Sequence, residues 1–182
     1  MTLFKNKYRI ESSRLKGWDY RRTGAYFITI CTKNREKIFG NVVMDKVVLN
    51  DIGKIVEEEW LKTPKIRNYV ELDVFIIMPN HLHGIIFIYN DDLEKKIFEQ
   101  EIKHLSFQNE YNKNHYLKSK SISSFINQFK SVTTKRIKRL YINDFSWQSR
   151  FYDHIIRNEN SLSKIRDYIL HNPIKWTLDE YY

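Results

Sequence analysis

Residues 70–90 carry the pattern that most restricts how this chain can fold, because two apolar segments meet there at a Pro-Asn turn. The segment reads VELDVFIIMPNHLHGIIFIYN, and its second half opens with His81-Leu82-His83. Apolar runs rich in Val, Ile and Phe around a tight turn are typical of neighbouring β-strands. Because side chains alternate between the faces of a strand, His81 and His83 are expected on the same face.

Two imidazoles at this spacing can bind one metal ion. The pair shares its predicted face with Ile85 and Phe87, so that face should be at least partly covered. Buried imidazoles need polar partners, and a metal ion would supply one. The alternative is a pair of solvent-facing strand residues, because the H-x-H motif is short. The residues themselves leave both interpretations open.

The chain is strongly basic, with 31 Lys and Arg against 22 Asp and Glu and a net charge of +9. This charge favours polyanionic partners such as nucleic acid or an acidic membrane surface; a basic enzyme unrelated to either is the alternative. The single cysteine, Cys31, excludes an internal disulfide and a thiolate metal cluster, and it fits a reducing cytoplasm. No stretch approaches the ~18 apolar residues of a membrane span, and the N-terminus lacks the apolar core of a secretory signal.

At 182 residues, one domain is expected. We predict a basic N-terminal arm at 1–23, a domain at 24–176 with a polar insertion at about 90–120, and a tail at 177–182. The expected elements are a strand at 24–33, a helix that Asn50 caps and Pro64 ends, the two strands at 70–89, a helix that Ser121 caps, a strand within 147–157, and a helix at 162–172 that Pro173 stops. This order predicts an α+β fold, a ferredoxin-like antiparallel sheet with helices packed on one side.

Two basic segments are candidate DNA-binding surfaces. The arm interleaves Arg14, Arg21 and Arg22 with aromatic residues, a mixture that suits phosphate contacts and base stacking. The helix after Ser121 carries positive charge without any acidic residue up to Leu140. Its candidate phosphate contacts are Lys130, Lys135, Lys138 and Arg139. A poorly ordered terminus and a solvated helix face are the respective alternatives.

Four ordered segments resemble the REP-associated tyrosine transposases, which belong to the HUH superfamily of single-strand DNA nucleases and transposases. The segments are YFITICTKNR at 26–35, MPNHLHGII at 78–86, WQSRFYDHIIRNE at 147–159 and IRDYILHNPIKW at 165–176. The arm sequence RLKGWDYRRTGAYF is also similar to the N-terminal pattern of the family. The resemblance spans roughly residues 15–176 without the insertion at 90–120, and it implies the HUH nuclease fold.

The resemblance implies a role for each matching residue. His81 and His83 match the pair that binds the catalytic divalent metal, Mg or Mn, and Asn172 matches the amide that completes the metal site, where related transposases often have Gln. Tyr168 matches the nucleophile. Judged from the residues alone, the more usual interpretation of such a helix tyrosine is a core residue, packed beside Ile165 and Ile169. Its distinction is that Asn172, four residues later, lies on the same helical face.

The implied activity is cleavage and rejoining of single-stranded DNA at hairpin-forming imperfect palindromes through a 5′-phosphotyrosine. Arg150 joins the candidate DNA contacts. Such an enzyme would act in the bacterial cytoplasm, associated with the nucleoid when bound to DNA and not with a membrane, as a monomer or homodimer. The alternatives are a domesticated, non-catalytic protein that binds hairpin DNA, and a replication-initiation or relaxase-type HUH nuclease.

Overall fold

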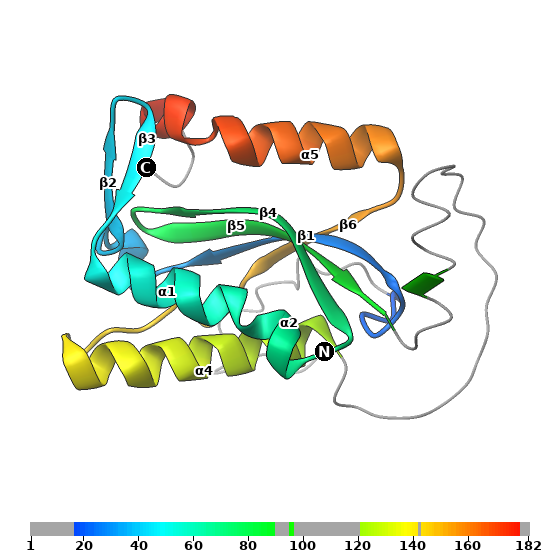
Figure 1. The fold of residues 1–182 in the computed structure, drawn as a ribbon, viewed down its shortest axis with the longest axis horizontal. Helices are drawn as coiled ribbons and strands as arrows, with labels where there is room; N and C mark the ends of the chain where they lie inside the picture. The colour runs from blue at the N-terminus through cyan, green and yellow to red at the C-terminus, as the bar shows by residue number, and fades with distance from the viewer. Residues whose placement is uncertain (1–16, 90–94, 97–120, 142, 179–182) are drawn as a thin grey trace, which may run out of the picture.

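A four-stranded antiparallel sheet forms the centre of the protein in the computed structural model (Figure 1). The structure describes residues 17–89, 95–96, 121–141 and 143–178. The sheet has the order β4-β5-β1-β6. The strands are β1 (Gly24–Cys31), β2 (Gly40–Val43), β3 (Lys46–Leu49), β4 (Val70–Met78), β5 (His81–Ile88) and β6 (Tyr152–Ile156). The helices are η1 (Lys33–Arg35), α1 (Asp51–Leu61), α2 (Thr63–Ile66), α4 (Ile122–Leu140), α5 (Glu159–His171) and η2 (Pro173–Leu178).

The predicted α+β class and the antiparallel sheet are confirmed, and the strand order is that of a ferredoxin-like fold. The placement of all helices on one side is wrong. Figure 1 shows α1 and α4 on one face of the sheet and α5 on the other. Both faces of the sheet are apolar, because alternate residues of β1 and β5 enter two separate hydrophobic clusters. Each face therefore needs its own helical cover.

The helix termini follow the predicted capping signals. The Asn50 side chain accepts a hydrogen bond from the Gly53 amide at the start of α1, and Ser121 does the same for Ser124 at the start of α4. Pro64 does not simply end α1 but lies in the first turn of α2. Proline is tolerated at that position, because the first amides of a helix have no partner within it.

A two-stranded hairpin, β2 and β3, precedes α1 and was not predicted. Its turn residues Met44 and Asp45 have φ values of 48° and 59°. Positive φ at both central residues is the geometry of the two-residue turn that matches strand twist, and it usually takes Asn or Gly. The residues at this turn therefore gave no clear hairpin signal.

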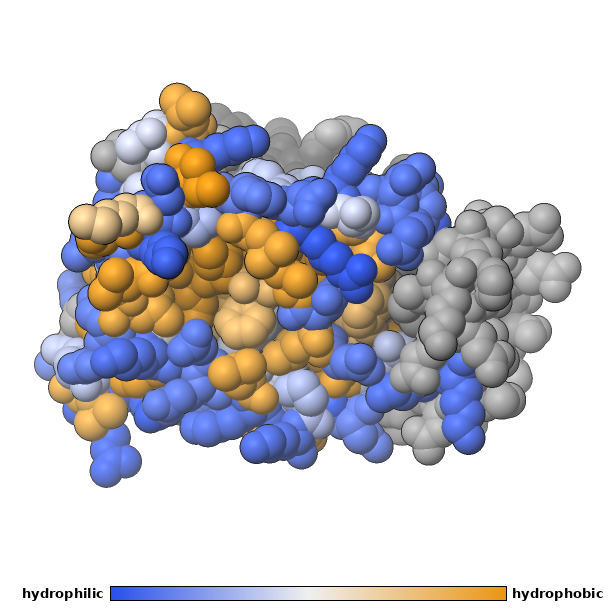
Figure 2. Space-filling view, turned by 45° about the horizontal axis from the view of Figure 1, so that its top comes forward, coloured by the Kyte–Doolittle hydropathy of each residue, from blue (hydrophilic) through white to orange (hydrophobic). Residues whose placement is uncertain are grey.

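The bounds of the predicted domain remain a prediction. Most of the basic arm, including Arg14, lies outside the described residues, and so do most of the insertion at 90–120 and the last four residues of the tail. Within the described part, no helix is long and apolar enough to cross a membrane. Figure 2 shows a band of hydrophobic residues between hydrophilic ones on the face turned to the viewer.

Gly84 lets the α1 side of the core approach the strand that carries the two histidines. A Cβ at this position would lie 2.8 Å from Cζ2 of Trp60 and 3.3 Å from Cβ of Phe75. We expect Gly84→Ala to lower the free energy of unfolding by about 1–3 kcal/mol, the usual cost of overpacking a core. Chemical denaturation measures the change. Gly24→Ala is the control, because its Cβ would make only ordinary contacts at 3.6 Å or more; an equal loss in both variants would contradict the packing argument.

Candidate functional site

His81 and His83 lie side by side on β5, as the alternation of the strand predicts. Their ring centroids are 4.4 Å apart, and neither residue is exposed. His83 belongs to the sheet face covered by α5, where the ring of Phe27 lies 5.4 Å from its own. The solvent-facing alternative is therefore wrong: the imidazoles form a buried pair.

Each imidazole is oriented by a polar neighbour at Nδ1. Nδ1 of His81 lies 2.7 Å from Oδ1 of Asn80, and Nδ1 of His83 lies 2.8 Å from Oγ1 of Thr29. An amide oxygen only accepts hydrogen bonds, so the His81 ring carries its proton on Nδ1 and its lone pair on Nε2. Burial, with a smaller contribution from the charge of Arg35, lowers the pKa of His81 to about 3. His81 is therefore neutral near pH 7, the state that a metal ligand requires.

Tyr168 reaches this pair from α5. Its hydroxyl lies 3.2 Å from Nε2 of His83, and the two ring centroids are 5.2 Å apart. The tyrosine side chain is only half covered, with 41% of the residue exposed. A core tyrosine would be enclosed, so the core interpretation of Tyr168 is wrong. The hydroxyl meets the buried histidine at its inner end while the ring stays accessible from the cleft.

The position of α5 over the sheet has clear causes. Leu162 and Ile169 pack into the hydrophobic cluster on this face of the sheet. Nε of Arg166 donates a 2.8 Å hydrogen bond to Oδ2 of Asp73 on β4. Both groups are partly shielded from solvent, so the pair is screened less than a fully exposed one. Apolar burial and this ion pair together fix the helix that presents Tyr168.

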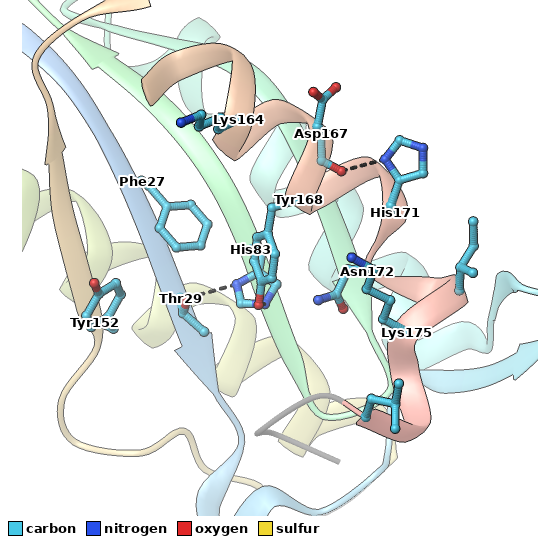
Figure 3. Close-up of a pocket in the computed structure, with 12 residues that line it drawn as sticks. Phe27, Thr29, His83, Tyr152, Lys164, Asp167, Tyr168, His171, Asn172 and Lys175 are labelled. Carbon is cyan, nitrogen blue, oxygen red and sulfur yellow. Dashed lines mark hydrogen bonds between the residues drawn. The ribbon is translucent and has the colours of Figure 1, made fainter. Parts of the chain in front are cut away.

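Asn172 is the C-cap residue of α5, four residues after Tyr168. A residue before proline usually avoids the helical region, yet Asn172 keeps helical angles, φ −59° and ψ −40°. The residue is 2% exposed. Figure 3 shows the side chains of Asn172 and Tyr168 on the same wall of the cleft, with the Asn172 amide directed toward His83. Tyr168 and Asn172 are one helical turn apart and line the same cleft, as their spacing in the sequence predicts.

His83, Tyr168 and Asn172 line one cleft of about 830 Å³ between α5, η2 and the sheet (Figure 3). Its lining is formed by Phe27, Thr29, His83, Tyr152, Lys164, Asp167, Tyr168, His171, Asn172, Ile174, Lys175 and Leu178. This lining contains two lysines, Lys164 and Lys175, and one carboxylate, Asp167. The cleft therefore suits an anionic ligand with apolar or aromatic parts.

The donor set fits a divalent metal. No cluster of three His, Cys, Asp or Glu residues that could hold an ion occurs in the part of the chain that the structure describes. The candidate ligands are therefore two imidazoles, His81 and His83, together with the amide oxygen of Asn172. Imidazole and amide ligands suit several first-row ions. The polar partners at Nδ1 leave the Nε2 atoms to act as ligands, the usual arrangement around bound metals.

No protein-family model matches the chain. A Haemophilus influenzae protein described as uncharacterized is 40% identical over 172 residues, covering 94% of this chain and 92% of its own length. A second Haemophilus influenzae protein, named "Putative REP-associated tyrosine transposase", is 24% identical over 157 residues, covering 86% of this chain and 74% of its own. This chain is therefore similar in sequence to a protein named as a REP-associated tyrosine transposase.

The fold of this chain is shared with a solved structure. A REP-associated tyrosine transposase bound to a REP hairpin matches it with a TM-score of 0.58 and 20% identity. The match covers 92% of this chain and 76% of the other. At this identity the likeness speaks for the fold alone, and it confirms the fold class that the four sequence segments implied.

The structure does not bring the predicted DNA contacts together. Lys135, Lys138 and Arg139 are exposed on α4, on the opposite face of the sheet from Tyr168 (Figure 1). Arg150 is exposed in the loop before β6. Arg21 is also exposed but is engaged by Asp19, with 2.5 Å between Nη2 and Oδ2.

The prediction that Lys130 contacts DNA phosphates from an exposed helix face is wrong. The residue is 9% exposed, and its ammonium donates to the backbone carbonyls of Gln148 and Arg150 at 2.8 and 3.1 Å. Burial lowers the pKa of Lys130 to about 8. Lys130 therefore holds the loop before β6 and does not belong to an exposed phosphate-binding surface. Helical periodicity could not reveal this, because the carbonyls that receive the ammonium come from a distant loop.

The sequence patterns assigned no part in the site to Thr29, Asn80 and Lys164, and they indicated Tyr152 only as a second candidate nucleophile. Thr29 and Asn80 orient the histidines, and Tyr152 and Lys164 line the approach to Tyr168. Asn80 was visible as the residue before His81 in the Pro-Asn turn. Thr29 needed the strand register, which places it opposite His83. Tyr152 and Lys164 needed the packing of α5 over the sheet, which no local pattern records.

Proposed function

We propose that this chain is a metal-dependent endonuclease and strand transferase that cleaves and rejoins single-stranded DNA through a 5′-phosphotyrosine at Tyr168. The observation that carries the proposal is the contact between the Tyr168 hydroxyl and Nε2 of His83, whose ring lies 4.4 Å from that of the buried His81. Asn172 lines the same cleft as Tyr168 and His83. The relationship to REP-associated tyrosine transposases supports the same activity. Each residue that the proposal requires is present in this chain, namely His81, His83, Tyr168 and Asn172, which supports a catalytic over a purely binding role.

The reaction balances without an external energy source. The Tyr168 oxygen attacks a DNA phosphorus, the bond from that phosphorus to the 3′-oxygen breaks, and the 3′-oxygen leaves as a hydroxyl after gaining a proton. The phenol proton is lost to solvent or a basic group. The protein then holds the 5′-phosphate, and the phosphotyrosine ester conserves the energy of the original bond. A 3′-hydroxyl from another strand can attack the ester and reseal the DNA, which returns the tyrosine.

His81, His83 and the Asn172 amide would hold the ion, Mg or Mn. When bound, the ion supplies positive charge at the scissile phosphate and helps the 3′-oxygen leave. A phenol has an ordinary pKa near 10 and is a weak nucleophile at neutral pH, so stabilisation of charge in the transition state is the main requirement. A neutral imidazole has one lone pair, so Nε2 of His83 serves either the Tyr168 hydroxyl or a ligated ion. If Nε2 of His83 held the ion, the Tyr168 hydroxyl would no longer hydrogen-bond to this imidazole.

The proposed substrate is single-stranded DNA that folds into imperfect hairpins. Support comes from the related transposase whose structure is bound to a REP hairpin, and from the net charge of +9 on this chain. The direct experiment incubates the wild-type protein with labelled hairpins that carry single-stranded extensions, with Mn or with a chelator. A band that survives denaturation with Mn alone is the expected result. Hairpin binding without any such band would favour the non-catalytic DNA binder.

DNA binding is expected to depend on salt through the exposed basic face of α4. Replacing Lys135, Lys138 and Arg139 by Ala should reduce the slope of log K against log salt by up to about 3, roughly one for each phosphate that the variant leaves without its cation. Fluorescence anisotropy with a labelled hairpin across a salt series measures the slope. The control replaces three exposed lysines elsewhere, Lys46, Lys54 and Lys65. An unchanged slope in the α4 variant would mean that this face does not touch DNA.

A further inference from the structure

The cleft beside Tyr168 continues along the edge of the sheet. A shallower groove of about 580 Å³ shares Phe27, Tyr152 and Lys164 with the main cleft and extends to Asn158, where α5 begins. In the described part of the sheet, β6 lies at the end of the strand order and pairs with β1. The cleft and the groove together therefore lead from Tyr168, past Tyr152 on β6, to the start of α5.

The floor of this path is aromatic. The ring of Phe27 lies 6.0 Å from that of Tyr168 and 6.2 Å from that of Tyr152, edge-on in both cases. Phe27 is buried, whereas Tyr168 and Tyr152 are 41% and 44% exposed. Tyr152 thus presents its ring at one end of a row of touching rings that has the proposed nucleophile at the other. Figure 3 shows Tyr152 on β6, across the cleft from α5.

A positive charge accompanies the exposed ring. Lys164 lies on α5 one turn before Tyr168 and lines both the cleft and the groove. Figure 3 shows its side chain extending toward the side of the cleft that Phe27 and Tyr152 occupy. An accessible aromatic face next to an ammonium, along an open groove, is the combination that binds unpaired nucleotides. A duplex does not offer its base faces in this way.

We infer that Tyr152 is a stacking platform for the unpaired base next to the scissile phosphate, and that Lys164 contacts a phosphate of the same single strand. This inference rests on the proposed function and adds the route by which the single strand enters the site. Stacking requires the ring and not the hydroxyl. The role is therefore distinct from that of a second nucleophile, for which the hydroxyl would be essential.

The test compares two DNA ligands on the Tyr168→Phe protein, which cannot consume them. One is a hairpin with single-stranded extensions, selected from a randomised hairpin pool by binding to this protein; the other is the same hairpin trimmed to its paired stem. Tyr152→Leu should weaken binding of the extended hairpin by roughly 5- to 150-fold, the range for loss of one stacked base. Binding of the trimmed hairpin should not change, and Tyr152→Phe should bind both like its parent.

Two further variants complete the experiment. Lys164→Gln should weaken binding of the extended hairpin alone and reduce its salt slope by about 0.7, the value for one single-strand phosphate. Tyr141→Leu removes another exposed tyrosine, 52% exposed at the end of α4, and should change neither ligand. Equal weakening of both DNAs by Tyr152→Leu would indicate a structural role and overturn the inference.

Failure of the inference and failure of the proposed function give different results. If the wild-type protein cleaves the extended hairpin but Tyr152→Leu binds it with unchanged affinity, the stacking platform is wrong and the proposed function stands. If no hairpin is selected from the pool and none is cleaved, the proposed function falls and the inference falls with it.

Discussion

Tyr168→Phe is expected to remove the covalent protein–DNA adduct while leaving folding and hairpin binding intact. The substitution keeps the ring and its edge-on contact with Phe27 and deletes the one oxygen that would attack the phosphate. Loss of a sole nucleophile costs on the order of 10⁶ in rate, so cleavage should fall to background. A denaturing gel with labelled hairpin DNA measures the adduct, and anisotropy measures binding.

The matched control for this variant is Tyr152→Phe, which deletes the hydroxyl of the other accessible tyrosine in the cleft and should still form the adduct. In the wild-type structure the Tyr168 hydroxyl lies 3.2 Å from Nε2 of His83, and Tyr168→Phe removes this contact. Its affinity for Mn should therefore equal or exceed that of the wild type. An adduct that persists in Tyr168→Phe but disappears in Tyr152→Phe would move the nucleophile to Tyr152.

His81→Ala is expected to abolish cleavage by a different route, through loss of metal. The hydrogen bond that orients His81 goes to Asn80, whereas the Tyr168 hydroxyl contacts His83. The variant should therefore leave the nucleophile in place and still bind hairpin DNA. Affinity for Mn, measured by titration calorimetry in the absence of DNA, should fall at least 10-fold, the lower end of the range even for losing a partner of a ligand.

Because His81 is fully buried, a second variant guards against a trivial loss of structure. His81→Leu fills more of the space without offering a ligand atom, and it should show the same loss of metal with a circular dichroism spectrum like that of the wild type. His154→Gln is the control for metal affinity, because His154 is exposed on β6. Unchanged Mn affinity in both His81 variants would contradict the assignment of the histidine pair as ligands.

The strongest local patterns predicted the site well. The alternation around the Pro-Asn turn was enough to place His81 and His83 on one face, because residues two apart in any β-strand point to the same side of the sheet. The one-turn spacing on the last helix was enough to align Tyr168 with Asn172. Both predictions depend on neighbouring residues of a single element, which is the scale at which sequence patterns carry structural information.

Other features depend on contacts between distant segments, and the sequence could not predict them. The contact of Tyr168 with His83 requires α5 to cross the sheet, which the burial of Leu162 and Ile169 and the Arg166–Asp73 pair bring about. Lys130 was assigned to a basic surface, because its acceptors lie in a loop that the helical pattern does not include. The same limit explains why helices were expected on one side only.

Peptide mapping of the covalent adduct tests the central claim most directly. Digestion with nuclease and trypsin should leave a nucleotide on one tyrosine, and the two accessible tyrosines of the cleft fall in separate tryptic peptides, FYDHIIR at 151–157 and DYILHNPIK at 167–175. Tandem mass spectrometry should place the nucleotide mass on Tyr168 in the second peptide, in a reaction that requires Mn. A nucleotide on any other residue, or no modified peptide from any hairpin that the protein binds, would contradict the account.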